Sequence, residues 1–146
     1  MSKMTVLIVE DDRDEQEFMM DAFVRNCSGC QVEFANNGLE MTELLAPGEN
    51  GEPPVLPSII LLDLNMPIKD GYEALKEIRE TPELKDICVV VVTSSGHPEE
   101  EQRCKNLGAN NFYHKPISLG EYDTMVREII SEDMHIPLNK PAKKHQ

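Results

Sequence analysis

The chain is poor in basic residues, in long apolar runs and in cysteine, and each scarcity removes a class of function. It has 14 lysines and arginines against 27 aspartates and glutamates, a formal net charge of −13. Such a charge repels a phosphate backbone, and no basic face stands out apart from residues 140–144. We therefore expect no direct binding to nucleic acid.

Long hydrophobic segments are also missing. No stretch approaches the roughly 20 apolar residues that a membrane span needs. Residues 1–12 lack the long apolar segment and the small-residue cleavage site of a signal peptide. We expect a soluble cytoplasmic protein that does not insert into a membrane.

Cysteine occurs only four times. Cys27 and Cys30 form a C-x-x-C motif that follows a predicted helix instead of opening one, so the helix dipole does not favour a thiolate there. We expect plain reduced thiols at these positions, and neither a redox nor a zinc role.

A chain of 146 residues can bury one core, which predicts one domain and little room for a separate effector. We place this domain at residues 4–133. Residues 134–146, with two prolines and terminal lysines, are expected to form a flexible tail, and residues 47–57 an exposed polar loop.

Apolar runs of strand length alternate with segments of helical spacing. Continuous apolar runs are typical of strands that are covered on both faces, and strand–helix alternation indicates right-handed crossovers. The pattern predicts an α/β fold, an open parallel sheet of five strands with helices on both faces. The strand order cannot be counted off the sequence, but five strand–helix units fit the flavodoxin-like doubly wound order 2-1-3-4-5. The predicted strands are 6–9, 31–35, 59–62, 89–92 and 111–114, and the predicted helices are 14–25, 39–46, 72–79, 99–107 and 119–132.

Polar residues stand where the predicted strands end. Three acids, Glu10 to Asp12, follow the first strand, Asp63 follows the third, Thr93 the fourth and Lys115 the fifth. Because ligands of open parallel sheets bind beyond the carboxyl ends of the strands, these side chains should meet at one edge.

Converging carboxylates raise each other's pKa unless a cation shares their site. A few ligands from strand ends, with room for water, suit Mg²⁺ or Mn²⁺ better than Ca²⁺. An Asp beside such a metal can attack a phosphoryl group and form an aspartyl phosphate.

These residues resemble the receiver domains of two-component response regulators. The resemblance covers about residues 4–133 and rests on four pieces in order: VLIVEDD at 6–12, LLDLNMP at 61–67 with Asp70-Gly71, VVTS at 91–94, and Gly108-Ala109 leading to Lys115-Pro116. With its long 47–57 loop, the chain looks similar to the small stand-alone regulators of phytochrome-type histidine kinases.

The resemblance implies a role for each matching residue. Asp63 matches the phosphoacceptor, and the peptide bond before Pro116 matches one that is usually cis in the family. The metal ligands would be Glu10 through water, Asp11, Asp63 and the backbone carbonyl of Asn65. Thr93 would be the switch hydroxyl and Lys115 the phosphate-binding lysine. Phe112 would be the switch aromatic, a position where Tyr is commoner.

The resemblance also implies the function. A histidine kinase or phosphotransfer protein would donate the phosphoryl group, and the chain would catalyse its own phosphorylation and slow dephosphorylation, without being a metabolic enzyme. Asn65 and Ser95 would help to set the hydrolysis rate. Output would pass to a downstream protein target, another phosphotransfer protein or a second copy of the chain, through the fourth helix, fifth strand and fifth helix.

Three other classes fit less well. A haloacid-dehalogenase-type phosphatase needs an acid two residues after its nucleophile, where this chain has Asn65. A flavodoxin-like flavin binder would not carry Glu10-Asp11-Asp12 where its phosphate loop belongs. A pseudo-receiver that is never phosphorylated would have no need for Asp63, Thr93 and Lys115 together.

Overall fold

The apolar runs of the sequence form the strands of one parallel sheet. The computed structural model describes residues 4–95 and 97–136. The strands are β1 Met4–Val9, β2 Cys30–Ala35, β3 Ile59–Leu62, β4 Cys88–Thr93 and β5 Asn111–His114. The helices are α1 Arg13–Asn26, α2 Gly38–Leu44, α3 Gly71–Glu80, α4 Pro98–Asn106 and α5 Leu119–Glu128, with a 3₁₀ turn at Glu49–Gly51 and a π turn at Ile129–Asp133.

The strand order is β2-β1-β3-β4-β5, and every pairing is parallel. This confirms the doubly wound, flavodoxin-like fold and its predicted strand order. The register places Val9 of β1 beside Leu62 of β3, so these two strands end level with each other. The residues that follow them, Glu10 and Asp63, consequently leave the sheet at the same edge.

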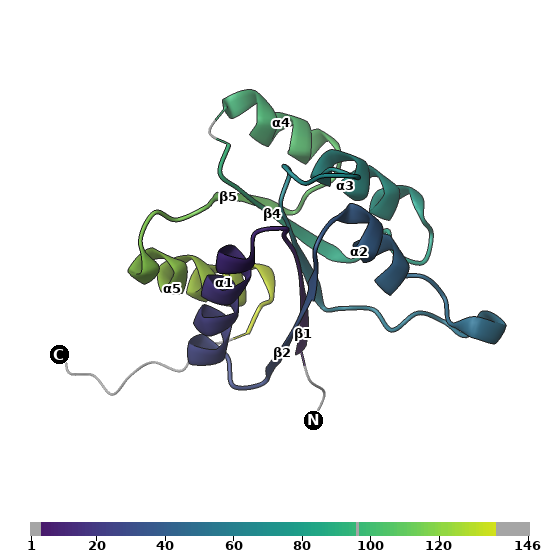
Figure 1. Cartoon of the computed structure of the whole chain (residues 1–146), viewed down its shortest axis with the longest axis horizontal. Coiled ribbons are helices and arrows are strands. Elements are labelled where there is room, and N and C mark those ends of the chain that lie inside the picture. The colour runs from purple at the N-terminus through teal and green to yellow at the C-terminus, as the bar shows by residue number, and fades with distance from the viewer. Residues whose placement is uncertain (1–3, 96, 137–146) are drawn as a thin grey trace.

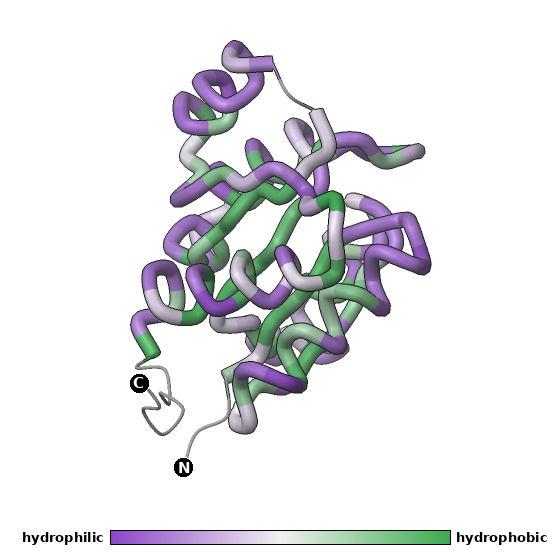
Figure 2. Tube along the Cα trace, turned by 90° about the vertical axis from the view of Figure 1, so that its left-hand side faces the viewer, coloured by the Kyte–Doolittle hydropathy of each residue, from purple (hydrophilic) through white to green (hydrophobic). Residues whose placement is uncertain are grey.

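Helices cover both faces of the sheet (Figure 1). On one face, α2, α3 and α4 pack through residues such as Met41, Leu75 and Cys104. On the other face, α1 and α5 pack through Phe23 and Val126. The strands form the hydrophobic centre of the molecule, and the hydrophilic residues lie mainly on the outer helices and loops (Figure 2).

The central strands are buried because both faces are covered. All four residues of β3 are at most 1 % exposed. Burying a Val, Leu or Ile side chain contributes about 1.5–3 kcal/mol, so this strand is a major source of stability. It also forms a rigid base for the loop that follows it.

Residues 134–136, which were expected to belong to a flexible tail, pack against the core. Met134 is 8 % exposed, and Ile136 packs partly buried against the α1 and α5 side of the core. The rest of the predicted tail, residues 137–146, lies outside the described residues. The 47–57 loop is exposed as expected, with Val55 91 % exposed.

The expectation of reduced thiols at the C-x-x-C motif was wrong. Cys27 and Cys30 form a disulfide across the turn between α1 and β2. The amide of Cys30 donates to the carbonyl of Cys27, and this tight turn brings the two Cα atoms to 5.5 Å, within the range of disulfides. Cys88 and Cys104 are free thiols.

Candidate functional site

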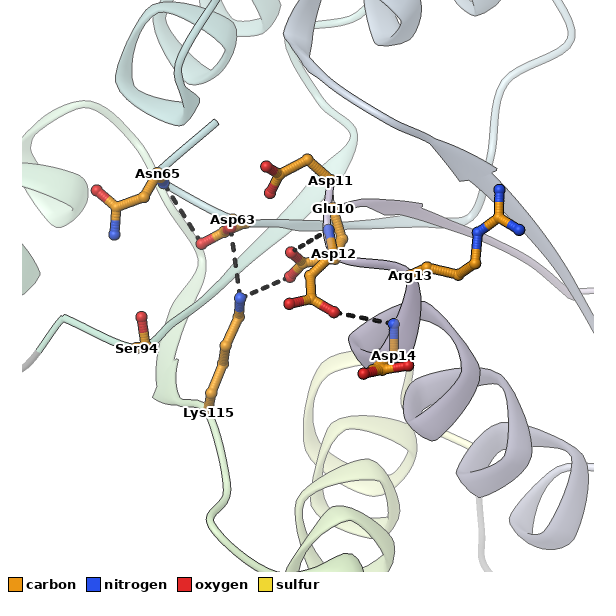
Figure 3. A pocket seen from close by; sticks show the side chains of 9 residues that line it. All are labelled: Glu10, Asp11, Asp12, Arg13, Asp14, Asp63, Asn65, Ser94 and Lys115. Carbon is orange, nitrogen blue, oxygen red and sulfur yellow. Dashed lines mark hydrogen bonds and ion pairs between the residues drawn. The ribbon is translucent and has the colours of Figure 1, made fainter. Parts of the chain in front are cut away.

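An open cavity of about 500 Å³ lies at the carboxyl edge of the sheet. Figure 3 shows that its side chains come from the loops after β1, β3, β4 and β5 and from the start of α1. The sequence predicts polar groups at these strand ends, and the fold brings them together. The cavity is lined by Glu10, Asp11, Asp12, Arg13, Asp14, Asp63, Asn65, Ser94 and Lys115.

The sheet's hydrogen bonds position the first residue after each strand. The amide of Glu10 donates to the carbonyl of Ala35 at 2.9 Å, and the amide of Asp63 donates to that of Val9 at 3.0 Å. On the other side, the amide of Lys115 donates to the carbonyl of Thr93 at 2.8 Å. These bonds extend the ladders into the site, so its side chains start from fixed backbone.

Asp12 has a different place from its two acidic neighbours. Its Oδ1 atom accepts hydrogen bonds from the amides of Asp14, at 2.9 Å, and Glu15, at 3.2 Å, which makes it the N-cap of α1. The amide of Asp12 in turn donates to Oε2 of Glu10 at 3.0 Å. The cap therefore fixes the direction in which the acidic loop enters the helix.

Lys115 bridges two buried carboxylates of the site. Its Nζ atom lies 2.7 Å from Oε1 of Glu10 and 3.4 Å from Oδ2 of Asp63. The Lys115 side chain is 14 % exposed, and those of its partners are 6 % and 4 % exposed. Water screens these charges poorly, so the three groups depend on one another.

Burial dominates the acid–base behaviour of these groups. Burial, with the nearby charge of Asp63, raises the pKa of Glu10 from 4.5 to about 7, although hydrogen bonding to Lys115 opposes the rise. Burial also raises the pKa of Asp63 against the charge of Lys115. Burial acts to lower the pKa of Lys115, but the hydrogen bond to Glu10 and the charge of Asp63 outweigh it and raise that pKa.

The acidic residues fit a divalent cation. One carboxylate oxygen from each of Glu10, Asp11 and Asp63 lies within 4.8 Å of the others. Asp11 is exposed and reaches the cavity from its open side, whereas the other two are buried. Oxygen ligands of this kind suit Mg²⁺ or Mn²⁺, and a cation would offset the raised pKa values of the buried pair.

Thr93 and Phe112 lie farther from the acids. Thr93 is fully buried, and its Oγ1 atom accepts long contacts of 3.4 Å from Nδ2 of Asn65 and from the amide of Ser95. Phe112 is 9 % exposed, within the core on the α4 side, where its ring meets that of His114 edge-on. Neither side chain lines the cavity. Asn65 contacts both Thr93, through its side-chain amide, and Asp63, through its backbone amide.

The expectation of a cis peptide bond before Pro116 was wrong. In the part of the chain that the structure describes, no peptide bond is cis. An X–Pro bond favours trans by about 0.5–1 kcal/mol unless its surroundings select cis. The expectation came from the family resemblance alone, and no other feature of the sequence supported it.

Two residues that shape the site, Gly71 and Ser94, were not predicted from the sequence. Gly71 begins α3 against the backbone of Asp63 and Leu64, and a Cβ atom there would overlap the carbonyl oxygen of Asp63. Ser94 lines the cavity, although its motif suggested no role for it. The signal for Gly71 was present in the Asp-Gly pair, but the sequence did not show which backbone that glycine would approach.

Comparison with known proteins identifies the family. The chain matches the response regulator receiver domain over residues 6–143 and belongs to that family. The parallel five-stranded fold and the acidic edge are those of a receiver. Among the described residues, no helix has the length and apolarity that crossing a bilayer requires.

The relatives include small regulators of the kind that the sequence resembles. Response regulator Rcp1 of Synechocystis is 32 % identical over 126 residues, which are 86 % of this chain and 86 % of Rcp1. The Mn²⁺-bound form of Rcp1 has a TM-score of 0.81 at 30 % identity, covering 94 % of this chain and 99 % of that one. The phosphorylated cyanobacterial phytochrome response regulator RcpA has a TM-score of 0.80 at 29 % identity, covering 95 % and 100 %.

Proposed function

We propose that Asp63 accepts a phosphoryl group from a phosphohistidine on a histidine kinase or phosphotransfer protein. The observation that carries this proposal is the convergence of Glu10, Asp11, Asp63 and Lys115 at one open edge of the sheet. A carboxylate oxygen of Asp63 attacks phosphorus, a P–O bond forms, and the P–N bond to histidine breaks. The donor's imidazole nitrogen keeps the electron pair and takes up a proton.

The metal site would be made of Glu10, Asp11, Asp63 and the backbone carbonyl of Asn65, with Glu10 acting through water. A bound Mg²⁺ or Mn²⁺ would supply positive charge that offsets the charge of the phosphoryl oxygens. The Mn²⁺-bound Rcp1 structure supports this reading. Asp63 must be ionised to attack, and Lys115 at 3.4 Å favours that form against burial.

Lys115 and Thr93 would hold the transferred group. The Lys115 ammonium already lies beside the nucleophile and can neutralise a phosphoryl oxygen. The Thr93 hydroxyl would donate a hydrogen bond to another oxygen after moving toward Asp63. In this arrangement the chain catalyses its own phosphorylation, because its own residues supply the nucleophile, the metal ligands, Lys115 and Thr93.

The signal would leave through α4, β5 and α5. When Thr93 moves inward, Phe112 can take up the vacated space, which biases a two-state surface. A downstream protein target, a phosphotransfer protein or a second copy of the chain would read this surface. Slow attack by water, controlled by Asn65 and Ser95 beside the site, would return the chain to its resting state.

The input and the boundaries are also part of the proposal. The likeness to RcpA, a cyanobacterial phytochrome response regulator, supports a phytochrome-type histidine kinase as the phosphoryl donor. We place the receiver at residues 4–133, extended by the packed residues 134–136, with the rest of the predicted tail, 137–146, after it. We place the protein in the cytoplasm, where its kinase would meet ATP.

Intact mass after incubation with acetyl phosphate and Mg²⁺ tests the proposal. Wild type should gain one phosphoryl group, and Asp63→Asn should gain none. Asp86→Asn, a change of the same kind at an exposed position away from the cavity, should behave as wild type. An unmodified wild type, or an Asp63→Asn variant that gains as much as wild type, would refute the assignment.

A further inference from the structure

Lys69 fastens the loop between β3 and α3 through its main chain. Its carbonyl oxygen accepts a hydrogen bond from the amide of Gly38 at 3.2 Å, and its amide donates to the carbonyl of Pro67 at 2.8 Å. Ile68, between Pro67 and Lys69, has a φ of 69°, a conformation that β-branched residues rarely adopt. This strained turn persists only if its surroundings hold it.

The side chain of Lys69 supplies a second attachment. Its Nζ atom donates to Oγ1 of Thr42 on α2 at 2.9 Å and pairs with Oε2 of Glu77 on α3 at 2.5 Å. Thr42 also bonds to the other carboxylate oxygen of Glu77. The three groups form a closed set, which we call the Lys69 anchor, and it joins the loop to two helices.

Burial and charge indicate that the anchor is well formed. The side chains of Lys69 and Glu77 are 19 % and 36 % exposed, against 54 % and 43 % for Lys105 and Glu101 in their surface pair. Burial acts to raise the pKa of Glu77, but the hydrogen bonds from Lys69 and Thr42 outweigh it and lower that pKa. The anchor therefore differs from an exposed ion pair, which contributes little.

Close backbone contact at Gly38 explains how α2 reaches the loop. A Cβ atom at Gly38 would lie 2.7 Å from the carbonyl oxygen of Lys69 and 2.9 Å from its Cγ atom. Only glycine allows this approach without displacing the loop. Main chain and side chain of Lys69 are thus both held against α2, four residues beyond Asn65.

We propose that Lys69 is a positioning residue for the divalent-metal site, because the Lys69 anchor holds the loop that presents the carbonyl of Asn65. This inference rests on the proposed function, which makes that carbonyl a metal ligand. Without the anchor, the strained turn at Ile68 can relax and Asn65 loses its fixed orientation. Binding of a cation must then also order the loop, and the entropy lost in this ordering weakens the binding.

Mg²⁺ titration by calorimetry tests the inference, with Lys69→Met as the main variant. Methionine keeps the length of the stem but removes the three donors, and we expect a Kd about tenfold weaker than wild type. Hydrogen exchange should become faster in the amides of residues 64–70. Lys69→Arg, which keeps the charge and can still reach Glu77, should recover most of the affinity.

Two further variants keep the test decisive. Thr42→Val removes the hydroxyl with little change of shape, so it should weaken Mg²⁺ binding in the same direction even if Lys69→Met is poorly folded. Lys105→Met removes an exposed lysine that lies outside the anchor and should bind Mg²⁺ as wild type does.

The outcomes separate this inference from the proposed function. If folded Lys69→Met and Thr42→Val bind Mg²⁺ with wild-type affinity and unchanged loop exchange, the anchor only stabilises the fold and the inference is wrong. If wild type itself binds no Mg²⁺, the proposed metal site fails, and the inference falls with it. Weaker binding that Lys69→Arg restores supports the positioning role.

Discussion

Lys115 lies closer to Glu10 than to Asp63: its Nζ atom is 2.7 Å from Oε1 of Glu10 and 3.4 Å from Oδ2 of Asp63. One ammonium thus compensates two buried carboxylates, and it favours the acid that is not the proposed nucleophile. A cation that bound Glu10 would free Lys115 to turn toward Asp63. The observed arrangement therefore holds the proposed phosphate-binding lysine nearer to Glu10 than to the proposed nucleophile.

Removal of the Lys115 ammonium should destabilise the protein, because the ammonium compensates the charges of both Glu10 and Asp63. Lys115→Met leaves two buried acids without a partner, and we expect a loss of about 3 kcal/mol in the free energy of unfolding at pH 8 in EDTA. Denaturant melts measure it. At pH 5.5 the loss should shrink, because protonation removes the uncompensated charge.

Lys105→Met is the matched control for that experiment. Its ammonium pairs with Glu101 on the exposed surface of α4, so its removal should change stability by no more than about 0.5 kcal/mol. Equal effects of the two substitutions would mean that the Lys115 pairs carry no special weight.

The stability of the protein without metal should fall as pH rises through neutrality. The pKa of Glu10 is about 7 in the folded chain against an ordinary value of 4.5. Because the pKa is raised in the folded state, the contribution of Glu10 to the free energy of unfolding is fully present below pH 4.5. It is lost as the pH rises through 7. In EDTA, the Tm should drop by on the order of 3 °C between pH 5.5 and pH 8.

Glu10→Gln and Mg²⁺ should each reduce this pH dependence. Glutamine cannot ionise, and the cation stabilises the ionised carboxylates. Glu33→Gln, on the exposed side of β2, is the control and should keep the wild-type slope. A Glu10→Gln variant whose Tm falls as steeply as that of wild type would contradict the assignment of the effect to Glu10.

Two glycine substitutions should have opposite effects. In Gly71→Ala the new methyl group meets the backbone of Asp63 and lies 2.7 Å from the Cα atom of Leu64, so we expect a loss of about 3 kcal/mol and weaker Mg²⁺ binding. Gly120→Ala in α5 meets nothing within 4 Å and should stabilise the chain by about 0.5–1 kcal/mol. Thermal melts with a Mg²⁺ titration compare them directly.

Reduction of the Cys27–Cys30 disulfide should lower stability modestly. The bond closes a loop of only four residues, for which the chain-entropy relation gives about 2 kcal/mol. Dithiothreitol should therefore lower the Tm of wild type but leave the Cys27→Ser/Cys30→Ser variant unchanged. An equal shift in both proteins would trace the effect to something other than this disulfide.

The sequence by itself determined the fold and the chemistry of the edge. Continuous apolar runs such as Ile59–Leu62 mark buried parallel strands, and the polar residues after them must meet where parallel strands end together. For this reason the meeting of Asp63 with Glu10 and Lys115 could be predicted without coordinates. The strand order could not be counted off the sequence, and its prediction came from the doubly wound arrangement that five strand–helix units fit.

Only the tertiary structure decided how the site is supported. The Lys69 anchor joins residues of α2, α3 and a loop, and no local pattern marks Thr42 or Glu77 as its partners. The Cys27–Cys30 disulfide likewise depends on the tight turn between α1 and β2. Periodicity reports which face of an element is buried, whereas such contacts depend on the distances between elements, and those arise only when the core packs.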